Sequence, residues 1–404
     1  MQLPSAIIYN ANFRNVWIGQ ILCQSANKAT MIVLLWWSLD RAGTLGSGAW
    51  ANGALLMANA LPAILLAPFI ARGLQRRSSR SVMALAQGAA ALGLGAMWAG
   101  AASHTLALPT AIALSAVVAA GQACVDAALN RSVCELVARA DLEQAVALEA
   151  ATQPLASLGG TALGVVAAGA AGLAPVLSLC AAAYAAAAWL TLRARFSPAG
   201  DRPDSASDAQ VFDASRDDPR VVRLLRVFAI ANFLLFPVFL VLPSFTRNTL
   251  QGTVAALGWL EGGFWCGLMA GTALARQLPH HPEGLPRLVG AALVAFGTAL
   301  AAMAASRSAP GAAAGLLVGG VAVGVVNVKV LSYFQQAVAD ERKPAFFARL
   351  QAWVGAGQPL GYATFTLVLS RVEPAMAFAA QGCGLLLLGA PLLLWRTRST
   401  AVQR

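Results

Sequence analysis

The chain has 404 residues, of which 58% are hydrophobic and 11% are charged, and its mean hydropathy is +0.66. Soluble domains carry about 25% charged residues, so this composition excludes a water-soluble enzyme. Six cysteines are too few for a secreted disulfide scaffold of this length. At about 20 residues per crossing, the chain has room for about twelve membrane helices. We therefore predict a polytopic protein whose surroundings are a lipid bilayer.

Hydropathy along the chain predicts two sets of six membrane spans. The first six cover roughly residues 15–38, 50–71, 81–101, 107–127, 146–168 and 172–192. The second six cover roughly residues 224–243, 254–275, 287–305, 310–333, 349–370 and 375–395. The prediction is an all-α membrane protein of twelve transmembrane helices.

The basic residues predict the orientation of the spans. The net charge is +11, and the bases lie mainly in short gaps between apolar runs rather than in a stripe interleaved with aromatic residues, which excludes a nucleic-acid partner. If both termini are cytoplasmic, nearly all the bases face inside, as the positive-inside rule requires. The bases left outside are Arg41, Arg247, Arg307 and Arg371.

A polar stretch between the sixth and seventh spans divides the chain into two halves. It contains several prolines and aspartates, and such a composition cannot bury a core. The triplet Gln153–Leu155 in the fifth span recurs as Gln358–Leu360 in the eleventh. We therefore predict two parallel six-helix repeats. Their boundaries are an N-terminal bundle at 1–192, a cytoplasmic linker at 193–222 and a C-terminal bundle at 223–404.

Three segments resemble the drug-efflux branch of the major facilitator superfamily, which includes macrolide efflux pumps and the enterobactin exporter. The run Asn12–Gln20, continued by Gln24–Lys28, is similar to the first helix of that branch. Leu257–Glu261 is similar to the start of its eighth helix, and Ala352–Gly361 to its eleventh. The resemblance implies the major facilitator fold, transport of a small molecule and a monomeric state.

The loop after the second span departs from the family pattern. The family usually has an Asp-Arg pair there, which joins a charge network on the inner side, whereas the segment Ala71–Arg77 has Gln75 in the position of the acid. The neighbouring arginines could still pair with Glu135 or Asp141. We assign the cytoplasmic gate to Gln75, Arg76, Arg77 and Arg80.

The first span carries a polar stripe. Gln20, Gln24, Asn27 and Lys28 fall at helical spacing on one face, with Lys28 near the middle of the membrane. Polar groups at this depth are costly unless they face a wet cavity or each other, so we expect them to bind substrate. The alternative is that Lys28 only pairs with a carboxylate to hold helices together.

Two further groups of polar residues lie inside the spans. Asn327 and Lys329 lie toward the inner end of the tenth span, and Asp126 lies at the equivalent place in the fourth. Asp126 and Lys329 either face each other as an inner gate or substrate contact, or reach water unaided. We assign Asn232, Asn327 and Lys329 to substrate binding.

Two carboxylates are candidates for proton coupling. Glu261 lies within the eighth span, where burial suits a proton carrier at neutral pH, and Asp126 is the second candidate. The alternative for Glu261 is a structural pair with Lys28 or a serine.

The histidines and cysteines have no catalytic or metal-ligand spacing, and no nucleotide-binding loop is present. We therefore predict no enzyme activity, no cofactor and no metal. The leading function is proton-coupled efflux of a siderophore or related anionic or amphiphilic metabolite across a bacterial inner membrane by alternating access. The alternatives are a multidrug pump, an organic-anion uptake permease and a membrane receptor that moves no solute.

Overall fold

The computed structural model describes residues 10–42, 45–137, 142–196, 218–278, 283–306, 308–339 and 342–394. Throughout these residues the regular secondary structure is helical, and none forms a β-strand. Eight of the helical segments in this part of the chain have the length and the apolar composition to cross a membrane. The predicted all-α membrane fold is confirmed.

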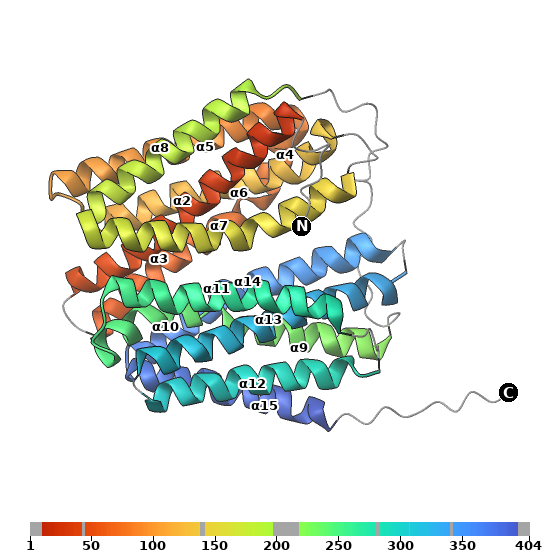
Figure 1. Cartoon of the computed structure of the whole chain (residues 1–404). Helices are drawn as coiled ribbons and strands as arrows, with labels where there is room; N and C mark the ends of the chain where they lie inside the picture. Colours follow the sequence, from red (N-terminus) through yellow and green to blue (C-terminus); the bar gives the residue numbers. More distant parts are fainter. Residues whose placement is uncertain are drawn as a thin grey trace. The chain divides into compact units, whose positions relative to one another are not determined.

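The first half of the chain forms one helical bundle. Its segments are α2 (Ala11–Ala42), α3 (Leu45–Leu65), α4 (Ala67–Arg76), α5 (Ser79–Ala102), α6 (Leu108–Leu136), α7 (Leu142–Ala171) and α8 (Leu173–Arg193). Helix α2 packs against α3, α6, α7 and α8, and α5 packs against α6 and α8 (Figure 1). Helix α2 is therefore the centre of this bundle.

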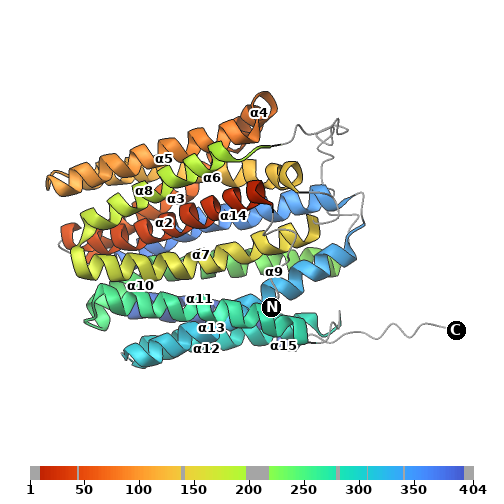
Figure 2. The same cartoon turned by 45° about the horizontal axis from the view of Figure 1, so that its top comes forward.

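The second half forms a bundle of its own. Its segments are α9 (Pro219–Leu235), α10 (Val238–Ser244), the π-helix η3 (Phe245–Thr249), α11 (Val254–Gln277), α12 (Leu285–Ser306), α13 (Ala309–Ala337), α14 (Lys343–Leu369) and α15 (Pro374–Leu393). Helix α12 packs on α13 and α15, and α9 packs on α14 and α15 (Figure 2).

The same helix pairings occur in both bundles. The pairs α5–α8, α5–α6 and α2–α7 of the first bundle correspond to α12–α15, α12–α13 and α9–α14 of the second. The chain divides accordingly into two compact units, with Met1–Ser207 and Thr253–Gly258 in one and the remainder in the other. The repeated helix pairings fit the predicted two-repeat fold. The bundle boundaries at 1–192 and 223–404 stay a prediction, as does the linker 193–222, which lies largely outside the described residues.

Each predicted span coincides with a helix, but two of the spans are interrupted. The second consists of α3 and α4, which meet at Leu66. The seventh breaks at Phe236 and Pro237, between α9 and α10. Pro237 has no N–H to donate to the carbonyl of Phe233, four residues earlier.

Neighbouring helices accommodate this break. Gln381 of α15 donates from Nε2 to the carbonyl of Leu234 at 3.2 Å. Gly361 of α14 lies against the carbonyl of Phe233, where an added Cβ would be 2.7 Å from the oxygen. A donor from one helix and the close approach of another thus stabilise the interrupted backbone, as membrane helices with internal proline require.

Glycines allow α11 and α13 to pack backbone against backbone. A Cβ at Gly267 or Gly271 of α11 would overlap a carbonyl oxygen of α13, and a Cβ at Gly320 or Gly324 of α13 would overlap a carbonyl oxygen of α11. Small residues in this spacing are the usual means of close helix packing in lipid. The second bundle is therefore held by direct backbone contact at this interface.

Candidate functional site

The polar stripe predicted on the first span lies on the uninterrupted helix α2. Gln20 is buried, and Gln24, Asn27 and Lys28 are half-buried. The buried Oε1 of Gln24 has no hydrogen-bond partner among the described residues. An acceptor in this state is able to receive a hydrogen bond from a bound molecule.

Helix α7 approaches the stripe through two glycines. A Cβ at Gly160 would overlap the carbonyl oxygen of Ser25 and would lie 3.0 Å from the Cβ of Lys28. A Cβ at Gly164 would lie 3.0 Å from the Cα of Ala29. The position of Lys28 therefore depends on α7 as well as on its own helix.

A chain of hydrogen bonds leads to Asp126 of α6. The hydroxyl of Tyr184 (α8) donates to Gln122 Oε1 at 2.8 Å, and Gln122 Nε2 donates to Asp126 Oδ1 at 2.8 Å. Tyr184 is fully buried and Gln122 is buried, whereas Asp126 is exposed. Tyr184 and Gln122 were not predicted from the sequence, because a tyrosine 62 positions away carries no local sign of a contact with Gln122.

A second buried polar contact lies in the same bundle. Thr191 of α8 donates to Gln87 Oε1 of α5 at 2.9 Å, and both side chains are fully buried. Trp17 of α2 donates to Thr152 of α7 at 2.7 Å. The first bundle thus contains several polar side chains that are paired across helices.

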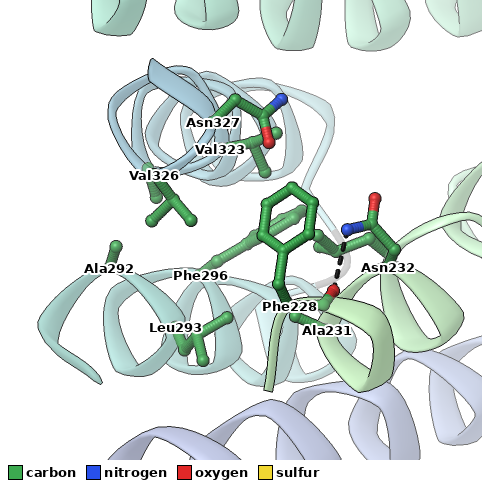
Figure 3. A pocket seen from close by; sticks show the side chains of 11 residues that line it. Phe228, Ala231, Asn232, Ala292, Leu293, Phe296, Val323, Val326 and Asn327 are labelled. Carbon is green, nitrogen blue, oxygen red and sulfur yellow. Dashed lines mark hydrogen bonds between the residues drawn. The ribbon is translucent and has the colours of Figure 1, made fainter. Parts of the chain in front are cut away.

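The second bundle contains a pocket between α9, α12 and α13. Two of the predicted substrate-binding residues, Asn232 and Asn327, line it, and the other lining residues are apolar. Asn232 Nδ2 donates to the carbonyl of Phe228 at 2.8 Å, so its Oδ1 is turned away from that bond (Figure 3). The pocket is lined by Phe228, Ala231, Asn232, Leu235, Ala292, Leu293, Phe296, Ala322, Val323, Val326 and Asn327.

Aromatic rings continue from the wall of this pocket. The ring of Phe296 lies 6.3 Å from that of Phe264, which packs edge to face on Trp265. Trp265 stacks on Phe239 with the ring centres 5.9 Å apart. The pocket was not predictable from the sequence, because the alanine, valine and leucine residues that line it look like those of any apolar span.

Lys329 is placed differently from its neighbour Asn327. Its side chain is 7% exposed, and Nζ donates to the carbonyl of Leu278 at 2.6 Å, just beyond the C-terminus of α11. A cation at a helix C-terminus interacts favourably with the helix dipole. Asp126 and Lys329 belong to different bundles, and the gate between them stays a prediction.

Glu261 lies on α11 and is 1% exposed. It is close enough to Tyr362 of α14 to act on that hydroxyl electrostatically, and Tyr362 accepts a hydrogen bond from Gln358 Nε2 at 3.2 Å. Gln358 belongs to the repeated triplet. Glu261 is therefore part of a polar cluster between α11 and α14.

The arginines assigned to the gate lie at the ends of α4 and α5. Arg76 and Arg77 are exposed, and Arg80 donates to the carbonyl of Leu192 near the C-terminus of α8. Arg131 of α6 similarly donates to the carbonyl of Leu74 in α4. The described contacts of Arg80 and Arg131 are helix-end contacts within one bundle. The side chains of Gln75 and Glu135, and the whole of Asp141, lie outside the described residues.

Comparison with known proteins gives the family. Residues 16–343 match the sequence profile of the Major Facilitator Superfamily. The chain belongs to the Major Facilitator Superfamily. It is therefore a multi-pass membrane transporter of small molecules and not an enzyme. A comparison with curated protein sequences gave no match.

Solved structures of superfamily transporters share the fold along nearly the whole chain. The nucleoside transporter NupG has a TM-score of 0.72 at 12% identity, covering 94% of this chain and 98% of its own. A bacterial homologue of the human lysosomal transporter Spinster has 0.73 at 14%, covering 96% and 97%. The human organic anion transporter MFSD10 has 0.63 at 18%, covering 95% and 99%.

Proposed function

We propose that this superfamily transporter exports a small amphiphilic organic anion, with siderophores as the leading class, in exchange for protons by alternating access. Its expected location is a bacterial inner membrane, where it acts as a monomer. The two bundles supply different chemistry for such a substrate. The first supplies a lysine and amides on α2, and the second supplies an apolar pocket with two amides.

The pocket in the second bundle is the observation that carries the proposal. Phe228 and Phe296 give it aromatic walls, and Asn232 and Asn327 add two polar groups to an otherwise apolar lining. Small-molecule sites have this composition, in which apolar side chains supply contact area and a few polar groups fix the orientation. A substituted aromatic ring, such as the catechol of a siderophore, suits such a pocket.

The stripe on α2 supports an anionic substrate. Lys28 supplies a positive charge within an apolar helix, and Gln24 Oε1 supplies a buried acceptor. A charged residue at this depth is costly, and such residues commonly mark the path of a substrate or ion. A lysine favours a carboxylate, phenolate or hydroxamate over a lipophilic cation.

Two carboxylates could carry the exchanged proton. Asp126 is exposed and accepts a hydrogen bond from Gln122, whereas Glu261 is buried beside Tyr362. A carrier has to meet water in order to load and release a proton, which favours Asp126. Glu261 is the second candidate.

The second candidate function is multidrug efflux. The rings of Phe239, Phe264, Trp265 and Phe296 form a continuous aromatic cluster beside the pocket. Aromatic faces attract cations and flat apolar rings without demanding one substrate shape. This cluster favours a pump of broad specificity.

The purified transporter in proteoliposomes with an imposed pH gradient tests these functions. A catecholate siderophore, a hydroxamate siderophore and a lipophilic cation are offered separately. We expect gradient-driven flux of a siderophore and at least about a tenfold loss in Val323→Phe, because the new ring fills the pocket. Val318→Phe is the matched control, since Val318 lies exposed on the same helix and does not line the pocket.

The outcomes separate the candidates. Flux of the lipophilic cation alone would favour multidrug efflux. Equal flux in Val323→Phe and wild type would show that the pocket is not part of the substrate site.

A second experiment uses cells. A strain in which the gene is deleted, grown without iron, should retain siderophore inside and lose it from the medium. Unchanged secretion by that strain would overturn the siderophore assignment.

A further inference from the structure

A continuous path of hydrogen bonds leads from the interior of the first bundle to an exposed carboxylate. It is formed by the side chains of Tyr184, Gln122 and Asp126. Tyr184 lies on α8, and the other two lie one turn apart on α6. Both hydrogen bonds measure 2.8 Å. The first links two helices, and the second runs along one helix.

Each group in the path has a defined hydrogen-bonding role. An ionised carboxylate only accepts, so it takes the N–H of Gln122. The amide can present Nε2 to Asp126 only if its Oε1 faces the other way, where the hydroxyl of Tyr184 donates to it. Tyr184 therefore fixes which end of the amide faces the carboxylate.

The same side chains can also form hydrogen bonds when Asp126 is protonated. If the amide of Gln122 turns over, its Oε1 accepts the new O–H of Asp126, and its Nε2 donates to the Tyr184 oxygen, which is able to accept. The proton is gained and lost at the exposed side of Asp126, and Gln122 and Tyr184 keep their own hydrogens. With Asp126 protonated, Gln122 remains hydrogen-bonded to both of its neighbours, while the phenolic hydrogen of Tyr184 has no acceptor within the path.

We propose that Gln122 and Tyr184 are positioning residues that hold Asp126 as the proton-carrying carboxylate. This inference rests on the proposed proton-coupled function and names how the coupling group is supported. A transporter has to protonate and deprotonate its carrier in every cycle. The amide of Gln122 can pair with Asp126 in both protonation states, as a donor to the carboxylate and as an acceptor from the carboxyl group.

Other ionisable groups surround this path within the bundle. Helix α2 contributes Cys23, which lies close to Asp126, and Lys28 on the polar stripe. Helices α8 and α6 contribute Cys180 and Cys124. Helix α3 has no ionisable residue, and α5 and α4 have only arginines, Arg80 near the start of α5 and Arg72 and Arg76 in α4. The side chains of Glu143 and Glu149 on α7 lie outside the described residues.

The buried pair Thr191–Gln87 provides a matched control. It is a hydrogen bond between a hydroxyl of α8 and an amide oxygen, just as Tyr184–Gln122 is, but Asp126 accepts from Gln122 and not from Gln87. If Tyr184 only helped to pack α8, Tyr184→Phe and Thr191→Val would have similar effects. The two variants therefore separate positioning from packing.

The test measures siderophore flux against pH in proteoliposomes for wild type, Tyr184→Phe, Gln122→Leu, Asp126→Asn and Thr191→Val. Gln122→Leu removes the N–H donor of Asp126, so we expect the midpoint of the pH profile to move to higher pH by about one unit. Tyr184→Phe should move it in the same direction by less. Both should lower kcat with little change in KM, whereas Thr191→Val should leave the midpoint in place.

The outcomes distinguish this inference from the proposed function. Unchanged profiles in Tyr184→Phe and Gln122→Leu, with coupling lost in Asp126→Asn, would overturn the positioning role and keep proton coupling through Asp126. Gradient-driven flux that survives in Asp126→Asn would overturn both the inference and the choice of Asp126, and would direct attention to Glu261. Thermal unfolding of each variant in detergent identifies any that fail to fold, and Gln122→Glu then serves as the second variant at that position.

Discussion

Helix α2 runs without interruption from Ala11 to Ala42, whereas its counterpart in the second bundle is divided into α9, α10 and η3. The two occupy corresponding places, since α2 packs on α7 and α9 packs on α14. Helix α2 carries its polarity on side chains such as Gln24 and Lys28. In the middle of the divided helix, from Val227 to Pro243, Asn232 is the one polar side chain, and the break adds backbone carbonyls.

This difference shows two ways of placing polar groups in an apolar medium. Side chains on an intact helix supply a positive charge and amides, as on α2. A proline break supplies neutral carbonyl oxygens and demands donors from neighbours, as Gln381 provides for Leu234. The repeats therefore share their packing and differ in chemistry, which fits a substrate with one charged and one apolar part.

The largest expected loss of stability comes from adding a methyl group where two helices pack backbone against backbone. In Gly320→Ala the new Cβ overlaps the carbonyl oxygen of Phe264, and in Gly160→Ala it overlaps that of Ser25. We expect each to lower the free energy of unfolding by about 1–3 kcal/mol. Gly160→Ala should also reduce transport beyond its effect on stability, because it displaces Lys28.

Gly95→Ala on α5 is the matched control for both glycine variants. No atom lies within 4 Å of a Cβ at this position, so the alanine should stabilise the helix by up to about 1 kcal/mol. Thermal unfolding in detergent measures all three variants. If Gly95→Ala and Gly320→Ala lowered the free energy of unfolding equally, the loss in Gly320→Ala would not come from the contact between helices.

A smaller effect is expected at the break in the divided helix. Gln381→Leu removes the donor to the Leu234 carbonyl, and we expect the free energy of unfolding to fall by about 1 kcal/mol, the usual net contribution of one hydrogen bond. In a Pro237→Ala background the helix can regain its own hydrogen bonds, so the cost of Gln381→Leu should fall. A double-mutant cycle measured by thermal unfolding checks this, and additive effects would contradict it.

The smallest effects are expected at the helix C-termini. Lys329→Gln removes a buried cation from the end of α11, and Arg80→Gln removes an exposed one from the end of α8. We expect the free energy of unfolding to fall by less than about 1 kcal/mol for the first and by still less for the second. The effect of Arg80→Gln should be smaller still in high salt, because salt screens exposed charges. Equal losses in both variants would show that burial does not decide the strength of these contacts.

The helices were predictable from the sequence, because a span in lipid has to be long, apolar and helical. Proline alone does not predict the break at Pro237, since Pro154 and Pro359 lie inside the uninterrupted helices α7 and α14. Asn232 and Asn327 stood out as amides within apolar spans, and the structure brings them to one pocket.

The parts that could not be predicted depend on contacts between distant segments. The hydrogen bond from Tyr184 to Gln122 and the overlap at Gly160 both depend on which faces of two helices meet. Hydropathy reports that a residue is apolar or polar but not which neighbour it meets. The contact of Lys329 with the end of α11 was missed for the same reason.

The central place of α2 in the first bundle has a consequence for how the protein is made. Helix α2 is synthesised before the other helices of its bundle. Gly160, which meets Ser25 and lies beside Lys28, follows about 130 residues later, or roughly 7–26 s at ordinary rates of synthesis. During that interval a lysine-bearing helix has to stay in or beside the insertion machinery. Release into lipid before α7 and α8 are made would leave it without the helices that surround it in the finished bundle.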